Sequence, residues 1–582
     1  MTYTVDKNVM VPMRDGVTLA TDLYLPDSGP APALLVRLPY GKDMLVTFGQ
    51  PLLPSPLAFV EAGYAVVWQD CRGTWGSDGT FRLQVDDAAD GVDTVQWIRQ
   101  QPWCDGKVGS YGASYLGMTQ WSTASQHPDG LNAIAPTTAP IDFHHTRYSR
   151  GGAMFWHTTL TWSASMTQLL ALRSLQRGAG DSAALIQAAD LVADPQPHLL
   201  KLPVGDQPLL NELSPWWRES LAHPVQDTYW AEVSPSERIT DITTPALHVG
   251  GWFDFFVPET TKAFIRMRAE AASPAARQNQ RLIIGPWDHR NQEGFYRDRA
   301  FGLRANALAA DITGAHLRFF NHHLRGDTAA DAGDAPVRIF VMGIDRWRDE
   351  PDWPLPDTRY VDYFLKSSGH ANTSSGDGVL SLDAPASEGV DTYRYNPVDP
   401  VPSIGGRSLP PGGVAGAALN AGPLDQSSVE IREDVLCFTT HVFGEPLEVT
   451  GEVSLVLHVS SSARDTDFTA KLLDVFPDGR ALYLTDGILR ARYRASLTAP
   501  DLLEPDQSHE LTVDLGPTAN VFLPGHRIRL EISSSNFPHY DRNTNTGGDI
   551  THGSDEPRIA VNRIFHGPQH PSRLILPVIQ RS

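Results

Sequence analysis

A serine set among glycines is the first feature of this sequence that suggests chemistry. The run Gly109-Ser-Tyr-Gly-Ala-Ser-Tyr-Leu-Gly117 follows a short apolar stretch and precedes a helix-like one. A strand ending near Tyr111, a tight turn and a helix from Tyr115 would place Ser114 on the turn, with its hydroxyl exposed at a helix N-terminus. This arrangement is typical of a nucleophile. A serine that only caps the helix is the alternative that the local pattern leaves open.

The small residues around Ser114 depart from the usual Gly-x-Ser-x-Gly pattern at one position. Gly112 precedes the serine by two residues, as the pattern requires, but Leu116 occupies the place of the last glycine and Gly117 follows one residue later. Ser110 lies within the expected strand and has no turn around it, so we expect a structural role for it. Ser114 is therefore the candidate nucleophile.

A serine nucleophile needs a base, and the base needs an orienting carboxylate. Asp254 closes the apolar run 246–253, and His289 closes the run that begins at Arg281, so each is expected just beyond the carboxyl end of a strand. Serine, acid and histidine follow one another in this order in α/β hydrolases. Asp288 is a second candidate for the acid, but its place next to His289 makes the far ring nitrogen hard to reach, so Asp254 is preferred.

The elements that must position these residues change character along the chain. In the first third, short β-branched runs alternate with a helical pattern at 86–101, which predicts a mostly parallel sheet covered by helices. An Asp-Gly turn at 15–16 joins two further strands. From about 145 to 240 the pattern is helical, and strand-like runs return afterwards. The strands expected in the sheet lie at 33–38, 64–68, 107–111, 131–135, 246–250 and 281–285.

Beyond about residue 350 the hydrophobic period becomes two. Val453, Leu455 and Leu457 alternate with Ser454, Val456 and His458, and many such short runs are separated by Gly, Pro and Asp turns. This pattern predicts an antiparallel sandwich or jelly roll, with the Pro- and Gly-rich run 397–423 as a long loop in it. We therefore predict an α/β-hydrolase core (1–144 and 241–350), a helical cap insertion (145–240) and a C-terminal β jelly roll (351–582).

Composition and charge exclude several classes of protein. With 41% hydrophobic and 20% charged residues the chain is globular, and 47 Lys and Arg against 68 Asp and Glu give a net charge of -21. This charge repels phosphate backbones and anionic membranes, so we expect neither nucleic acid nor a membrane as partner. Prolines and Glu61 interrupt the longest apolar stretch, 51–68. Three widely spaced cysteines and no visible signal peptide predict a cytoplasmic protein.

Three of these motifs together resemble a known family. Gly112-Ala-Ser-Tyr-Leu-Gly117, Gly251-Trp-Phe-Asp254 and Gly285-Pro-Trp-Asp-His289 are similar to the catalytic motifs of the cocaine esterase and X-Pro dipeptidyl-peptidase family of serine hydrolases. The family's Gly-x-Ser-Tyr-x-Gly form also accounts for Leu116. Further matching stretches, at 37–42, 69–79, 465–471, 486–492 and 536–543, extend the resemblance over nearly the whole chain. It implies the same three parts: core, inserted cap and jelly roll.

The resemblance also implies roles for individual residues. Ser114 would attack an acyl carbonyl, with His289 as base and Asp254 as the group that holds the imidazole. The backbone N–H of Tyr115 and the hydroxyl of Tyr40 would form the oxyanion hole. No cofactor is implied.

The resemblance further suggests the substrate. Phe256 and Trp162 fall where cocaine esterase places aromatic pocket residues, which suggests an apolar or aromatic acyl group. Core packing is the alternative for either taken singly. Arg147 stands where that esterase has a Trp, which argues against cocaine itself as the substrate. Phe255, Phe256 and Val257 follow Asp254 in place of the acidic residues expected in relatives that act on α-amino esters.

The remaining candidates and alternatives concern metals, assembly and function. We expect no metal at His144-His145 or His322-His323, because adjacent side chains diverge and neither pair has a carboxylate or cysteine at ligand spacing. Cys71 is expected to be a buried small residue. The oligomeric state stays open, with a homodimer among the alternatives. An esterase is preferred over an amide-cleaving relative (X-Pro dipeptidyl peptidase, α-amino acid ester hydrolase or β-lactam acylase) and over a non-catalytic, carbohydrate-binding jelly-roll protein.

Overall fold

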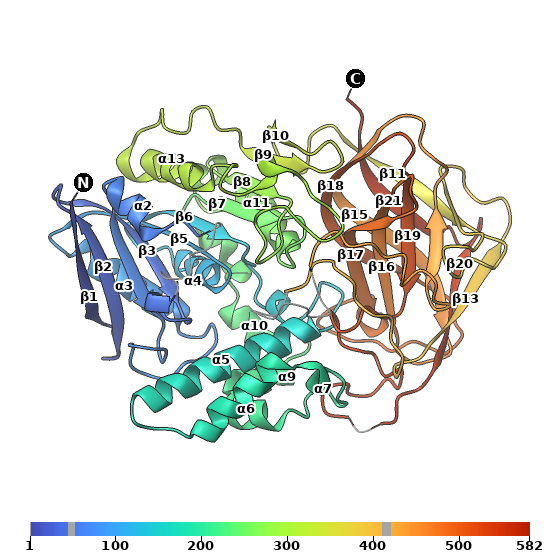
Figure 1. Ribbon diagram of the computed structural model, residues 1–582, viewed down its shortest axis with the longest axis horizontal. Coiled ribbons are helices and arrows are strands. Elements are labelled where there is room, and N and C mark those ends of the chain that lie inside the picture. Colours follow the sequence, from blue (N-terminus) through green and yellow to red (C-terminus); the bar gives the residue numbers. More distant parts are fainter. Residues whose placement is uncertain (1, 45–52, 410–420, 554, 582) are drawn as a thin grey trace.

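Two β-sheets organise the molecule (Figure 1). The structure is a computed structural model that describes residues 2–44, 53–409, 421–553 and 555–581. Within these residues, the first sheet has ten strands in the order β1-β2-β4-β3-β5-β6-β7-β8-β9-β10. The second sheet, near the C-terminus, has eleven.

The first sheet is parallel in its centre and antiparallel at both edges. The strands from β4 through β9 run parallel, while β1, β2 and β10 pair antiparallel with their neighbours. Its strands are β1 (Tyr3–Pro12), β2 (Thr18–Pro26), β3 (Ala31–Leu38), β4 (Ala65–Asp70), β5 (Cys104–Ala113), β6 (Leu131–Thr137), β7 (Leu247–Gly251), β8 (Arg281–Gly285), β9 (Val337–Val341) and β10 (Arg346–Glu350). The expected α/β-hydrolase core is confirmed.

The sequence predicted two strands after the insertion, and the structure adds β9 and β10. The prediction missed β10 because its sequence, Arg-Trp-Arg-Asp-Glu, carries the charges of a strand at a sheet edge and lacks a strand's usual apolar alternation.

Helices cover both faces of this sheet because its strands are apolar on both sides. Along β3, Leu34 and Val36 belong to one hydrophobic cluster with residues of α2 and α13, while Ala33 and Leu35 belong to another with residues of α3, α4 and α11. Such strands read as continuous apolar runs. The helices of the core are α2 (Pro56–Glu61), α3 (Asp87–Arg99), α4 (Tyr115–Ala124), α11 (Val257–Glu270), α12 (Pro274–Gln278) and α13 (Ile312–Arg325), with a 3₁₀ turn at Leu303–Ala305.

The chain between β6 and β7 is helical, as the pattern predicted. Its helices lie along the bottom of Figure 1 and are α5 (Trp156–Gln176), α6 (Ser182–Ala193), α7 (Gln196–Leu199), α8 (Pro208–Leu213), α9 (Pro215–Ala222) and α10 (Thr228–Val233), flanked by 3₁₀ segments His144–Thr146 and Pro235–Asp241. Asp181 caps α6 by accepting the N–H of Ala183 at 2.8 Å. We refer to these helices as the cap; the domain limits 144, 240 and 350 stay predictions.

The C-terminal domain is all β and lies to the right in Figure 1. Its strands are β11 (Thr358–Lys366), β12 (Val379–Ser381), β13 (Gly389–Tyr395), β14 (Leu436–Thr439), β15 (Leu447–Ser461), β16 (Asp467–Val475), β17 (Ala481–Arg490), β18 (His509–Phe522), β19 (Arg527–Ser533), β20 (Ala560–His566) and β21 (Arg573–Ile579), with a 3₁₀ turn at Ala491–Tyr493. All pairs are antiparallel except β12 with β14. Val453, Leu455 and Leu457 are buried, as their alternation predicted.

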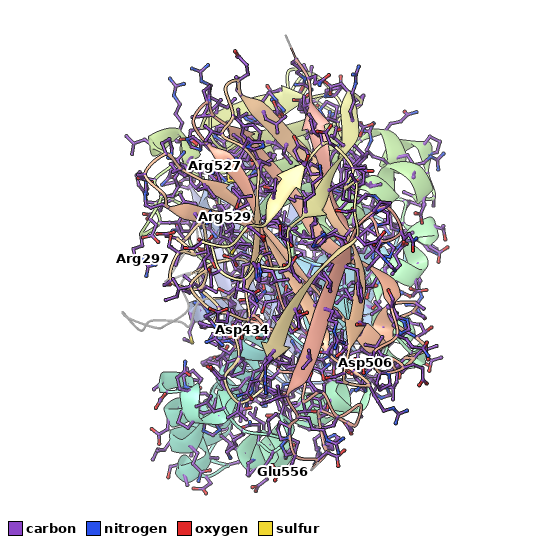
Figure 2. The ribbon with its side chains drawn as sticks, turned by 90° about the vertical axis from the view of Figure 1, so that its right-hand side faces the viewer. Arg297, Asp434, Asp506, Arg527, Arg529 and Glu556 are labelled. Carbon is purple, nitrogen blue, oxygen red and sulfur yellow. The ribbon has the colours of Figure 1, made fainter. Side chains whose placement is uncertain are left out.

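The outer surface of this domain carries charges of both signs, as Arg527, Asp506 and Glu556 illustrate (Figure 2). Part of the predicted loop 397–423 lies outside the described residues. No helix among those described is long and apolar enough to cross a membrane.

The C-terminal domain packs against both the cap and the core. The backbone N–H groups of Trp156 and His157, at the start of α5, donate to the carbonyls of His539 and Pro538, each at 2.9 Å. Arg407 is buried and donates to the carbonyl oxygens of Leu515 and Pro517, and also to that of Trp252 beside β7. These contacts hold the start of α5, the segment beside β7 and the C-terminal domain together around the candidate catalytic residues.

Candidate active site

Ser114 occupies a strained turn between β5 and α4. Its φ of 59° and ψ of −123° are unusual for a residue with a side chain, and neighbouring contacts hold the strain. The Ser114 N–H donates to the Thr137 carbonyl at 2.9 Å, and its carbonyl accepts the N–H groups of Gly117 and Met118. The side chain makes no capping hydrogen bond to α4, so the alternative of a simple helix cap is wrong.

The glycines of the motif are required by close packing. Gly112 has a φ of 144°, and a Cβ there would lie 2.5 Å from the Cβ of Leu116. A Cβ on Gly117 would lie 2.4 Å from the Cβ of Ala139. Gly117 stands one position after the place where the usual pattern has its last glycine. Without a side chain there, α4 can approach the segment after β6 closely.

The loops after β7 and β8, which carry the acid and the base, are bonded to each other. Trp252 donates its N–H to the Gly285 carbonyl and Phe253 donates to the Trp287 carbonyl, both at 2.9 Å. A Cβ on Gly251 would come within 2.3 Å of the Trp287 carbonyl oxygen, so only glycine allows this approach. The two loops thus form one rigid support.

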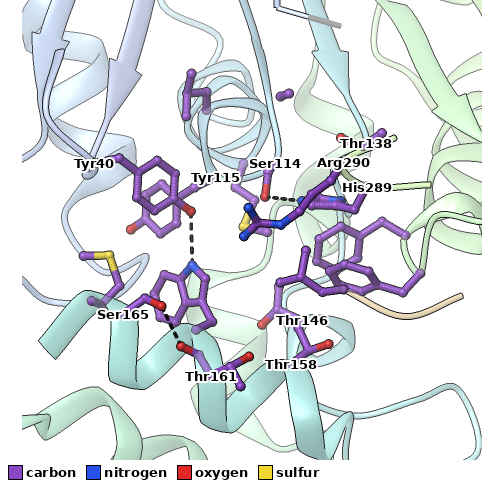
Figure 3. Close-up of a pocket in the computed structure, with 18 of the residues that line it drawn as sticks. Tyr40, Ser114, Tyr115, Thr138, Thr146, Thr158, Thr161, Ser165, His289 and Arg290 are labelled. Carbon is purple, nitrogen blue, oxygen red and sulfur yellow. Dashed lines mark hydrogen bonds between the residues drawn. The ribbon is translucent and has the colours of Figure 1, made fainter. Parts of the chain in front are cut away.

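Ser114, His289 and Asp254 form a continuous chain of hydrogen bonds, of which Figure 3 shows the one between Ser114 and His289. The Ser114 Oγ lies 3.0 Å from His289 Nε2, and His289 Nδ1 lies 2.6 Å from Asp254 Oδ2. Asp254 is fully buried, and its other oxygen accepts the backbone N–H of Phe256 at 2.7 Å. The carboxylate is therefore held in one orientation, which fixes the imidazole that contacts the serine.

Asp288 serves a different purpose from Asp254. Its Oδ1 accepts the backbone N–H groups of Arg290 and Asn291, each at 2.7 Å, so it shapes the turn that follows His289. Burial raises the pKa of the Asp288 carboxyl to about 6. The structure thus brings Asp254, and not Asp288, to the imidazole.

Tyr40 and Tyr115 lie next to Ser114 but present different groups. The Tyr40 hydroxyl accepts the indole N–H of Trp162 at 3.1 Å (Figure 3). The Tyr115 hydroxyl donates to Asp87 at 2.8 Å, while its ring stacks on Trp162 at 6.3 Å. Tyr115 is the first residue of α4, and the first N–H groups of a helix have no partner within it.

A cavity of about 290 Å³ opens over Ser114. One face of α5 forms its cap side, because Thr158, Trp162, Ser165 and Leu169 recur at helical spacing. Leu409 of the C-terminal domain also lines the cavity, so three parts of the chain enclose it.

The predicted pocket residues Phe256, Trp162 and Arg147 all line this cavity, so the core-packing alternative does not describe the two aromatic residues fully. The Arg147 guanidinium lies 4.8 Å from the centre of the Trp162 ring. Arg290 also lines the cavity and was not predicted; its only signal in the sequence was its place after His289.

The two reasons given against a metal at His322 and His323 do not hold in the structure, while the absence of a metal there stays a prediction. Their rings stack at 4.4 Å, and Asp331 Oδ1 lies 2.6 Å from His322 Nδ1, so the side chains do not diverge and a carboxylate lies beside them. It was missed because the loop after α13 brings Asp331 back to the helix. The Arg281 guanidinium lies 3.5 Å from the same carboxylate. Cys71 is buried, as expected, and burial raises the pKa of its thiol.

Comparisons with known proteins agree with this arrangement. Residues 15–291 match the model of the X-Pro dipeptidyl-peptidase (S15) family, and residues 330–575 match the X-Pro dipeptidyl-peptidase C-terminal non-catalytic domain. The chain is 49% identical to a cocaine esterase of Rhodococcus sp. (strain MB1 Bresler), over 100% of this chain and 99% of that protein.

Two solved structures extend the likeness to the fold. An α-amino acid ester hydrolase is similar with a TM-score of 0.79 and 26% identity, covering 99% of this chain and 96% of that one. An aminopeptidase from a marine sediment archaeon (Thaumarchaeota archaeon) has the same fold, with a TM-score of 0.81 at 24% identity and the same coverage.

Proposed function

The chain belongs to the X-Pro dipeptidyl-peptidase (S15) family and is a serine hydrolase of carboxylic esters, and from this premise we propose that Ser114, His289 and Asp254 carry the reaction. The observation that carries the proposal is the unbroken hydrogen-bond chain from Ser114 through His289 to buried Asp254 at the floor of a cavity. Ser114 and His289 are 175 positions apart in the sequence, and Asp254 and His289 are 35 apart. The fold connects the three in the order serine, histidine, carboxylate, which is that of a catalytic triad.

In the proposed reaction His289 Nε2 takes the proton of Ser114 as its oxygen attacks the ester carbonyl. The same nitrogen then gives this proton to the leaving alcohol, and an acyl-enzyme remains on Ser114. Water attacks the acyl-enzyme with His289 again as base, which releases the acid and restores the serine. Asp254 holds the imidazole tautomer and stabilises the imidazolium formed in each step.

The proposed oxyanion hole consists of the Tyr115 N–H and the Tyr40 hydroxyl. The place of Tyr115 at the start of α4 supports the first donor, because its N–H points out of the helix end and the helix dipole favours negative charge there. The hydrogen bond from Trp162 supports the second donor. Since the Tyr40 oxygen accepts from the indole, its own proton remains available for the developing oxyanion.

We propose an apolar or aromatic acyl group as the part of the substrate held by the cavity. Phe255 and Phe256 flank His289, with ring centres 4.9 and 5.8 Å from the imidazole, and Trp162 forms the opposite side. Aromatic walls favour flat apolar groups through area burial and stacking. No carboxylate lines the cavity among the described residues, which disfavours the ammonium of an α-amino ester or dipeptide.

The location and assembly of the protein remain proposals of ours. Three free cysteines support a reducing compartment such as the cytoplasm, and a net charge of -21 argues against nucleic acid and membranes as partners. A homodimer is tested by light scattering after size-exclusion chromatography, where a mass of 63.8 kDa marks the monomer.

The test of the catalytic proposal compares a neutral aryl ester with an alanyl-prolyl anilide, in the wild type and in Ser114→Ala. Ester turnover that the variant loses by a factor of about 10⁶, together with loss of fluorophosphonate labelling, is the expected result. Ester turnover that survives in Ser114→Ala overturns the assignment of the nucleophile. Preference for the anilide overturns the ester reaction in favour of the amide-cleaving alternative.

A further inference from the structure

Two arginines line the cavity over Ser114. Arg147 follows the 3₁₀ segment after β6, and Arg290 follows His289, so they come from different loops and line one cavity only in the folded chain. Among the described residues that line this cavity there is no Asp or Glu. The chain has 68 acidic residues in all, so the overall composition does not explain the absence of acidic residues from the described lining of this cavity.

Arg147 is buried without a carboxylate partner among the described residues. Only 5% of the residue is exposed, and the hydrogen bond of its guanidinium is long, from Nη1 to the Thr146 carbonyl oxygen at 3.4 Å. Burial lowers the pKa of its guanidinium to about 10, so it stays charged at neutral pH. A buried guanidinium is ordinarily paired with a carboxylate. The contact of Arg147 with the Trp162 ring replaces little of the stabilisation of such an ion pair.

Arg290, an exposed residue, lines the same cavity. Figure 3 shows its side chain directed past His289 toward the space in front of Ser114. No carboxylate lies within ion-pair distance of its guanidinium in the part of the chain that the structure describes. Asp288, the nearest acid in sequence, uses Oδ1 for two backbone N–H groups.

The segments that the structure leaves out cannot supply the missing charge. Residues 45–52 and 410–420 adjoin the cavity residues Leu53 and Leu409, but neither segment contains an Asp or a Glu. Arg290 is exposed to solvent and Arg147 is buried, so a carboxylate that pairs with them inside the cavity has to come from a bound ligand. A guanidinium facing an acid forms charge-assisted hydrogen bonds that are roughly twice as strong as neutral ones.

We propose that the enzyme prefers esters whose acyl half carries a second, ionised carboxylate, that is, half-esters of dicarboxylic acids, which Arg147 and Arg290 recognise. The inference rests on the proposed function of this site. The acyl half is the part concerned because Arg147 packs on Trp162, the aromatic wall proposed to hold the acyl group. Cationic esters, by the same charge, are poor substrates.

The experiment uses three flat ethyl esters of nearly equal shape: ethyl 4-carboxybenzoate, ethyl 4-carbamoylbenzoate and ethyl 4-amidinobenzoate. They differ at the far end of the acyl group in charge, from −1 through 0 to +1. We expect kcat/KM for the carboxylate to exceed that of the amide at least tenfold and that of the amidine at least a hundredfold. High salt should reduce the first ratio.

Variants assign the preference to the two arginines. Arg147→Gln and Arg290→Gln should each lower the ratio of carboxylate to amide turnover about tenfold. Arg218→Gln removes an exposed arginine of α9 that does not line the cavity, and should leave the ratio unchanged. Substitution of a buried residue such as Arg147 can prevent folding. Terephthalate binding is therefore also measured by calorimetry on Ser114→Ala, whose arginines are intact. We expect terephthalate to bind more tightly than terephthalamide.

The outcomes separate the two proposals. Equal turnover of all three esters, or a preference for the amidine, overturns the dicarboxylate inference while ester hydrolysis through Ser114 stands. Failure to cleave any of the three, together with failure on a neutral aryl ester, overturns the proposed function itself. A carboxylate preference that both arginine variants retain overturns the assignment to Arg147 and Arg290.

Discussion

The indole N–H of Trp162 donates to the hydroxyl of Tyr40 at 3.1 Å and so joins the cap helix α5 to the segment that follows β3. The bond spans 122 residues of sequence and uses the lone pair of Tyr40 while leaving its proton free. Through this bond the cap supports the Tyr40 hydroxyl that we propose as an oxyanion donor, in addition to forming a wall of the cavity.

Tyr40→Phe removes the proposed second oxyanion donor and the acceptor of the Trp162 indole N–H, while the ring remains. One such donor is worth about 2.7–4 kcal/mol, so we expect kcat to fall about 100- to 1000-fold with KM nearly unchanged. Steady-state kinetics on a neutral aryl ester give both constants. Tyr111→Phe, which removes a buried hydroxyl bonded to Trp68 away from the cavity, serves as the matched control. Full activity in Tyr40→Phe would show that the Tyr40 hydroxyl is not an oxyanion donor.

Gly117→Ala should destabilise the fold at the turn that carries Ser114. The added Cβ would lie 2.4 Å from the Cβ of Ala139, so either α4 or the segment after β6 must move. Overpacking of this kind costs about 1–3 kcal/mol, and the shift of α4 should lower kcat as well. Gly444→Ala is the control, because a Cβ there meets nothing within 4 Å. Chemical denaturation of both variants measures the difference, and equal midpoints would contradict the packing argument.

Stability in acid should depend on the buried imidazole of His248. Burial between Trp121 and Phe264 lowers its pKa to about 4, although a hydrogen bond to Gln280 opposes this shift. Because the folded pKa lies below the unfolded value of 6.5, the unfolded chain binds the proton more readily. Its contribution to stability is present above pH 6.5 and is lost as the pH falls toward 4, by about 3 kcal/mol.

His248→Gln tests this pH dependence. Its free energy of unfolding, measured in urea between pH 7 and 4.5, should fall less steeply than that of the wild type, by about 2–3 kcal/mol over this range. His370→Gln, at an exposed histidine, should retain the wild-type slope. Parallel curves for His248→Gln and wild type would show that other groups cause the acid sensitivity.

Arg407→Gln should disturb the catalytic loop from the C-terminal domain. Its guanidinium donates to three backbone carbonyls, one of them that of Trp252, two residues before Asp254. The variant would leave these buried acceptors partly unpaired, which costs about 1–3 kcal/mol for each group lost. We expect a lower thermal midpoint and a several-fold lower kcat. Unchanged kcat with lower stability would mean that Arg407 supports the fold and not the position of Asp254.

Local patterns in the sequence were sufficient for the backbone of the site. The glycines around Ser114 predicted a turn between strand and helix, and the strand-end positions of Asp254 and His289 predicted that they meet at one edge of the sheet. These inferences succeed because strand and helix periods act over a few residues, and because parallel strands place their carboxyl ends together. The change to period two after residue 350 predicted the all-β domain for the same reason.

Side-chain neighbours from distant segments were decided by the tertiary structure alone. Nothing in the sequence placed Arg290 in one cavity with Arg147, or Leu409 of the C-terminal domain beside Ser114. The return of Asp331 to His322 was likewise missed. Such contacts depend on loop paths and on the packing of three parts of the chain, which no local period encodes. The sequence by itself therefore determined the reaction type and the order of its elements, whereas the charge of the cavity, and with it the substrate we propose, emerged only when the folded chain placed two arginines and no carboxylate among the described residues that line the cavity.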